Sequence, residues 1–201
     1  MLRLTLLGVG AMNSPRYPPA GLLVRAARRR VVIDGGPGAE PPVRPDAWLV
    51  TDERAELRSA LRRLAGRYGL VPVVADFSAP GLEITPHPVA HTSHPTYGYA
   101  IRTGGRLAVW APEFWTFPPW AAGADLMFAD AAGWDRPIRF RGGVGGHAAV
   151  THTAVDAAAA GVRRVVYAHI GRPCLRAMDA GLRPPGGEWG VPGRTYRLPP
   201  V

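Results

Sequence analysis

The stretch 30–57 constrains the fold more than any other part of the chain. It contains two short apolar runs, Val31–Asp34 and Ala47–Val50, each followed by a turn that carries a carboxylate. Short β-branched or apolar runs bounded by turn residues predict buried strands. After the second run, Thr51 stands in a capping position, and helix formers with leucines on one face predict a helix from about Glu53 to Arg67.

Length and composition fit one domain covering residues 1–201. A chain of 201 residues with 47% hydrophobic content can bury a substantial core. The single cysteine, Cys174, excludes an intrachain disulfide framework and a cysteine-rich zinc site. No run is long and apolar enough for a signal peptide or a membrane span. We therefore expect a cytoplasmic protein that does not contact membranes.

The charge is strongly positive and comes entirely from arginine. All 24 basic residues are arginine, and the formal net charge is +9. This balance favours anionic partners, either small phosphoesters or nucleic acid. Because the arginines are scattered along the sequence, a solvated arginine surface is favoured over a dedicated nucleic-acid face.

The remaining chain alternates short apolar runs with turns rich in glycine and proline. Leu82–Val89 contains Pro86 and Pro88, which predicts a position at a sheet edge. Predicted strands are Leu2–Leu7, a hairpin of Gly21–Ala27 with Arg30–Asp34, Val71–Ala75, Leu82–Val89, a strand ending at Thr103, Leu107–Trp110, Asp125–Asp130, Arg164–Ala168 and Arg194–Leu198, with a helix at Thr153–Gly161.

The run VVIDGGPG, followed by a spacer and DAWLVT, resembles the metallo-β-lactamase superfamily. In that superfamily an aspartate-glycine turn precedes a strand that ends in Thr-His-x-His-x-Asp-His. Here Thr51 is followed by Asp52, Arg54, Glu56 and Leu57, so the three motif histidines are absent and Glu56 matches the motif aspartate. The resemblance implies an α/β fold, a four-layer αββα sandwich of two mixed β-sheets flanked by helices.

The distal half of the chain is similar to ribonuclease Z and its small phosphodiesterase relatives. His91 precedes Pro-Thr and Gly-Tyr pairs, and Glu113 follows a strand and a proline, where the relatives have a metal-bridging aspartate. Further on, Asp130 ends a strand, Gly-His147 precedes a helix, and His169 ends the next strand. The resemblance implies that His91 and His169 ligate metal and that Glu113 stands at the bridging position. It also implies that His147 with Asp130 donates a proton.

Only a reduced metal centre is compatible with the missing first motif. The hypothesis is one zinc or manganese ion held by His91, Glu113, His169 and Asp52, in a phosphodiester hydrolase that acts on a small anionic or phosphoester substrate. The resemblance also implies that Asp34 braces the site.

A competing hypothesis is a non-catalytic protein that binds a ligand or a partner and holds no metal. In it the guanidinium of Arg54 replaces the metal charge beside Glu113 and Asp34. Which of Asp52, Arg54 and Glu56 faces the site stays open. The aromatic segment 110–120 fits a ligand lip, the face of a homodimer or core packing, and these alternatives also stay open.

Overall fold

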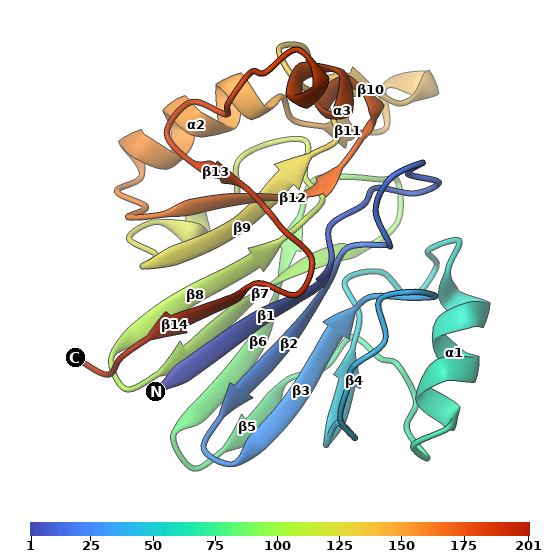
Figure 1. The fold of residues 1–201 in the computed structure, drawn as a ribbon, viewed down its shortest axis with the longest axis vertical. Helices are drawn as coiled ribbons and strands as arrows, with labels where there is room; N and C mark the ends of the chain where they lie inside the picture. The colour runs from blue at the N-terminus through green and yellow to red at the C-terminus, as the bar shows by residue number, and fades with distance from the viewer.

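The computed structural model describes all residues from 1 to 201 and shows two β-sheets packed face to face (Figure 1). The first sheet has the strand order β14-β1-β2-β3-β4, and the second has the order β13-β12-β9-β8-β7-β6-β5. Helix α1 lies beside the first sheet, and α2 and α3 lie on the far side of the second (Figure 1). The predicted αββα sandwich of two mixed sheets is thereby confirmed.

The elements have the following bounds. The first sheet consists of β1 (Leu2–Gly8), β2 (Gly21–Ala26), β3 (Arg29–Asp34), β4 (Ala47–Leu49) and β14 (Thr195–Leu198). The second consists of β5 (Phe77–Ala79), β6 (Leu82–Val89), β7 (Thr96–Thr103), β8 (Arg106–Ala111), β9 (Leu126–Ala131), β12 (Val165–Ile170) and β13 (Glu188–Trp189). The helices are α1 (Arg58–Gly66), α2 (Val150–Ala159) and α3 (Arg172–Asp179), with 3₁₀ turns at Pro119–Ala121 and Arg141–Gly143 and a small ribbon of β10 (Ile138–Arg139) and β11 (Gly146–His147).

The core lies between the two sheets. Alternate residues of β1, among them Leu2, Leu4 and Leu6, are fully buried and meet aromatic side chains such as Trp110 and Phe128 of the second sheet. A smaller cluster joins the outer face of β2, β3 and β4 to α1. Period-2 burial of this kind follows from the alternation of side chains along a strand. It explains why short apolar runs predicted most strands correctly.

The chain after β4 does not enter a helix at once, contrary to the prediction. Residues 51–57 form turns and bends, and α1 begins only at Arg58 with Leu57 as its N-cap residue. The prediction that Thr51 caps a helix starting near Glu53 is wrong. Thr51 instead donates its backbone N–H and its hydroxyl to the carboxylate of Asp34.

One further prediction is wrong, and one helix was not predicted. Val71–Ala75 is not a strand; only Val73 forms a parallel bridge, to Leu49. The segment after β12 contains α3, which the proline and glycine content of the C-terminal region obscured. The edge position predicted for Pro86 and Pro88 agrees with the pairing, because β5 covers only the first three residues of β6.

Three parallel strands position the functional side chains. β9 pairs in parallel with both β8 and β12. The carboxyl ends of parallel neighbours meet at the same sheet edge, so residues that end these strands come together there. No helix of the structure has the length and apolarity needed to cross a membrane.

Candidate functional site

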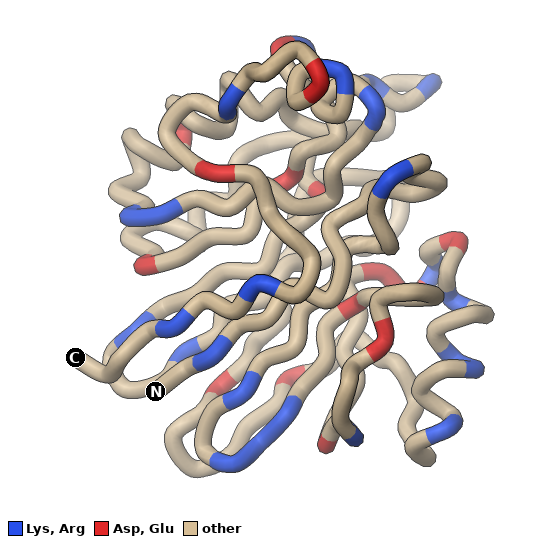
Figure 2. The backbone as a smooth tube through the Cα atoms, in the orientation of Figure 1, with Lys and Arg blue, Asp and Glu red and all other residues tan.

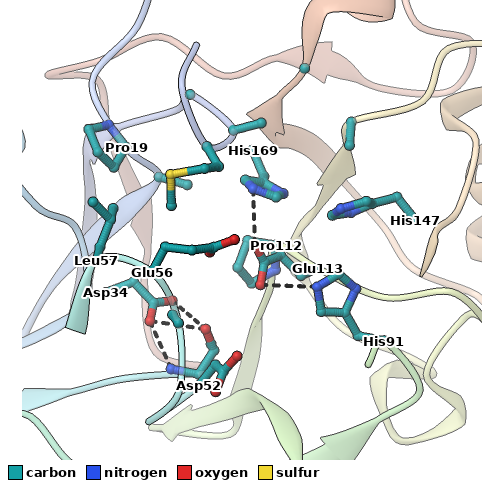
Figure 3. A pocket seen from close by; sticks show the side chains of 18 of the residues that line it. Pro19, Asp34, Asp52, Glu56, Leu57, His91, Pro112, Glu113, His147 and His169 are labelled. Atoms are coloured by element: carbon teal, nitrogen blue, oxygen red, sulfur yellow. Dashed lines mark hydrogen bonds and ion pairs between the residues drawn. The ribbon is translucent and has the colours of Figure 1, made fainter. Parts of the chain in front are cut away.

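A cavity of about 550 Å³ opens where the strand ends of both sheets meet. Its walls carry a set of acidic, basic and imidazole groups, shown from close by in Figure 3. The polar side chains that line it include Asp34, Asp52, Arg54, Glu56, His91, His94, Glu113, His147, His169 and Arg172.

Asp34 ends β3 and braces the cavity wall. Its Oδ1 accepts the Thr51 backbone N–H at 2.8 Å, and its Oδ2 accepts the indole N–H of Trp110 at 2.7 Å. Burial raises the pKa of Asp34 to about 6, although the bonds from Trp110 and Thr51 work in the opposite direction. Asp34 has φ of +57°, a left-handed conformation that costs energy in a residue with a side chain and that clusters at functional sites.

The Glu113 carboxylate lies between His91 and His169. Glu113 Oε1 lies 3.0 Å from His169 Nε2, and Glu113 Oε2 lies 3.5 Å from His91 Nε2. Figure 3 shows the carboxylate between the two imidazole rings. His169 also has φ of +57°, so the end of β12 is bent to aim its ring at Glu113.

The charges of this trio are strongly coupled. Burial opposes ionisation of Glu113, yet the neighbouring His169 and His91 hold its pKa down at about 2. Burial likewise opposes a charge on His169, but Glu113 and Asp130 more than offset it and raise the pKa of His169 to about 10. Without a metal, the centre is therefore an ion pair in which a proton on His169 balances Glu113.

Asp130 and His147 form a second unit beside the trio. Asp130 is fully buried, and its Oδ2 lies 2.7 Å from His147 Nδ1. Its oxygens also accept the backbone N–H groups of Phe114 and Ala132. Burial disfavours its charge, but His147 and His169 hold the pKa of Asp130 well below its usual range. The ionised Asp130 fixes the His147 ring, whose other nitrogen is left for the cavity.

His91, Glu113 and His169 offer two imidazoles and a carboxylate, ligand types that suit a divalent metal. His91 Nδ1 lies 2.8 Å from the Gly146 carbonyl oxygen, so this nitrogen carries the proton and Nε2 presents its lone pair. Bonds of about 2.0–2.1 Å in a tetrahedral site place neighbouring donor atoms about 3.3 Å apart. The separations of 3.0 and 3.5 Å are close to that value, but they involve different oxygens of Glu113, so the carboxylate would face His169 through Oε1 and His91 through Oε2. Two imidazoles with one glutamate are also a known catalytic zinc set.

The trio whose donor atoms all lie within 4.8 Å of one another is a different one, Asp130, His147 and His169. We favour the first set because the Asp130 oxygens already accept bonds from His147 and two backbone N–H groups. A carboxylate satisfied in this way orients a histidine more readily than it ligates a cation.

Residues 52–57 stand at the positions of the missing first motif and make contacts of their own. Asp52 lies apart from the trio's contacts: its Oδ2 is 2.8 Å from His94 Nε2, and its Oδ1 accepts the Arg54 backbone N–H at 2.7 Å. Arg54 is exposed, and the ion-pair partners of Glu113 are the two histidines. Glu56 is exposed and extends into the cavity, whereas Leu57 lies against Pro19 (Figure 3).

Two contributors to the site cannot be predicted from the sequence. His94, next to a proline, has the sequence context of a loop residue, yet it is the partner of Asp52. The Gly146 carbonyl, which fixes the tautomer of His91, lies 55 residues away from it in the sequence. Backbone contacts of this range leave no trace in residue types or spacing.

Comparisons with known proteins support the fold described above. No family model and no curated protein sequence matches the chain. Among solved structures, a metallo-β-lactamase fold protein, YhfI from Bacillus subtilis, superposes with a TM-score of 0.76 at 13% identity, covering 98% of this chain and 100% of that one.

Two more solved structures belong to the branch that the sequence resembles. A diphosphatase from the PhnP family gives a TM-score of 0.73 at 17% identity and covers 99% of this chain and 98% of its own. The short form of human tRNase Z gives 0.69 at 13% identity, covering 98% and 99%. The chain therefore has the metallo-β-lactamase fold, as its sequence predicted.

Proposed function

We propose that the protein is a metal-dependent phosphoester hydrolase with one metal per site. The observation that carries the proposal is the Glu113 carboxylate held between His91 and His169, with the Asp130-oriented His147 at the same cavity. The likeness of the fold to a diphosphatase and to a tRNase Z supports this class of substrate. These three residues would hold the cation, which supplies a Lewis acid for the phosphoryl group and activates water.

The chain's own residues account for binding and proton transfer. Arg54 and Arg172 line the cavity and supply positive charge for an anionic substrate. His147 holds its Nδ1 against Asp130, so its Nε2 is the atom that gives a proton to the leaving oxygen as the phosphorus–oxygen bond breaks. Asp130 stabilises the protonated ring before that transfer, because its carboxylate is buried and ionised.

The loss of the first motif favours a second candidate, an anion-binding protein without turnover. Leu57 occupies a ligand position of the resembled family and offers no donor atom. In this alternative the proton on His169 balances Glu113 in place of a metal. Arg54, which the sequence suggested for that role, is exposed and forms no ion pair with Glu113.

Metal analysis and hydrolysis of bis-p-nitrophenyl phosphate separate the two candidates. We expect about one zinc or manganese per chain and turnover that His169→Ala abolishes together with metal binding. His147→Ala is expected to retain the metal and to lower kcat by about 10²–10⁴-fold, the usual contribution of a general acid. His87→Ala is the matched control, because His87 stacks on Trp120 and does not line the cavity.

The outcomes are distinct. Metal binding without turnover on any phosphoester, or no binding of either ion, would refute the hydrolase. Equal loss of activity in the His87 and His147 variants would refute the assignment of the proton donor.

A further inference from the structure

Four arginines form a continuous row across the first sheet. The strand pairing places Arg197 opposite Arg3, Arg3 opposite Arg25, and Arg25 opposite Arg30. These pairs join β14, β1, β2 and β3 in spatial order. Directly opposed residues of antiparallel strands point to the same face, so the four side chains share one face of the sheet.

That face is the outer one. The flanking residues Leu2 and Leu4 of β1 are fully buried between the sheets, so Arg3 points the other way. Arg3 and Arg197 are exposed, and Arg25 and Arg30 are half-buried. Figure 2 shows the basic segments of these strands as an oblique row across the lower half of the molecule.

The positive charge of the row is poorly balanced from within the protein. Arg30 has an acidic neighbour, Asp46, at 3.9 Å. Arg25 reaches the hydroxyl of Thr5 at 3.4 Å, while its Nε is buried without a hydrogen-bond partner. Arg3 and Arg197 take part in no ion pair. Like charges directly opposed across strands destabilise a sheet, so an external polyanion would relieve a real repulsion.

We propose that this row binds the phosphate backbone of double-stranded nucleic acid. Adjacent strands lie about 4.8 Å apart, so the row spans about 14 Å and presents four guanidinium groups to the phosphates on either side of a groove. The next row toward the cavity begins with Thr195 and Thr5, whose hydroxyls bond each other; Thr5 is buried, and the half-buried Thr195 is the one within reach of a sugar-phosphate backbone. Arginine is well suited to phosphate because its planar fork offers several donors.

The composition of the surface favours a duplex over other polyanions. Single-strand binding surfaces add aromatic side chains on which bases stack, and neither the arginine row nor Thr195 and Thr5 provides one. Membrane-binding surfaces combine basic residues with apolar side chains that insert, which the row also lacks. The row is separate from the cavity, because Arg30 and Asp34 stand four residues apart on β3 and the row faces outward.

The test is the salt dependence of duplex binding. A short fluorescent duplex of mixed sequence is titrated with protein over a salt series, and the slope of log K against log salt is measured by anisotropy. Four phosphate contacts predict a slope of about −3.6. The double variant R3Q/R197Q is expected to bind more weakly, with the slope reduced in magnitude by about 1.8.

The matched control is R62Q/R63Q on α1, where both arginines are exposed and the net charge changes equally. We expect it to keep the wild-type slope, and both variants to keep the wild-type hydrolysis rate. Equal weakening in both variants would reduce the effect to overall charge and overturn the proposal. Tighter binding to single strands, or binding only to vesicles of anionic lipid, would overturn it as well.

Discussion

The raised pKa of Asp34 predicts that the contribution of this residue to stability falls as the pH rises from 4 to 7. Burial brings the pKa of this carboxyl from its ordinary 3.8 to about 6 in the folded protein. A proton therefore binds the folded chain more tightly than the unfolded chain. The resulting stabilisation is fully present below the unfolded pKa and is lost as the pH rises through 6.

The size of the effect follows from the two pKa values. The difference between 3.8 and about 6 corresponds to about 3 kcal/mol, since one pKa unit is 1.36 kcal/mol. Asp34 keeps a fraction of its surface exposed, so solvent screening lowers our expectation to about 2 kcal/mol. Glu113, with a folded pKa of about 2 and an ordinary value of 4.5, acts in the opposite direction, but its contribution is common to the wild type and an Asp34 variant and cancels when the two are compared.

The assay compares the wild type with Asp34→Asn by urea unfolding at pH 4, 5, 6 and 7, in the presence of a chelator. The substituted amide retains an oxygen for Thr51 but presents no acceptor pair to Trp110, so the variant starts from a lower stability. The informative quantity is the unfolding free energy of the wild type minus that of Asp34→Asn. We expect this difference to fall by about 2 kcal/mol between pH 4 and pH 7. Glu83→Gln, at an exposed position, is the control and is expected to show a constant difference.

Parallel stability curves for the wild type and Asp34→Asn would refute this reasoning. They would show that the hydrogen bonds from Thr51 and Trp110 fully offset the burial of the carboxylate. An advantage that grows with pH would be a stronger contradiction, because it would mean that Asp34 is held ionised.

Three further predictions concern packing and reactivity. Trp110→Phe removes the 2.7 Å bond to Asp34, and we expect a loss of about 1.5–3 kcal/mol in urea unfolding; a loss below about 0.5 kcal/mol would contradict a bracing role. Gly146→Ala places a Cβ on the Ile138 carbonyl oxygen at a φ of +157°, so we expect a marked drop in Tm and weaker metal binding, measured by calorimetry. Burial raises the pKa of the Cys174 thiol, so a thiol reagent is expected to modify it only in denaturant.

The sequence by itself determined the strand framework and pointed to His91, Glu113, His147 and His169, which line one cavity. Short apolar runs and turn residues located β1, β2, β3, β6, β8, β9 and β12, because burial on one or both faces of a sheet leaves a local pattern. The parallel arrangement of β8, β9 and β12 then makes it understandable that Glu113, Asp130 and His169 meet, since each lies at or beyond the carboxyl end of one of these strands.

Only the tertiary structure decided the connection after β4. In sequence, Thr51 and the acidic residues after it have the form of a helix start. In the folded chain Asp34 accepts the donors of Thr51, and Asp52 accepts the N–H of Arg54 and pairs with His94. Local capping preferences are worth about 1 kcal/mol, and several competing hydrogen bonds outweigh them.

The arginine row is a second feature that the tertiary structure decided and the sequence did not. Residues 3, 25, 30 and 197 are scattered in the sequence, which favoured a diffuse basic surface. Strand register places them side by side. Residue types and their spacing record local geometry, whereas the pairing of distant strands is set by the packing of the whole core. The charge of this chain could therefore be read from its sequence, but the surface on which that charge gathers could not.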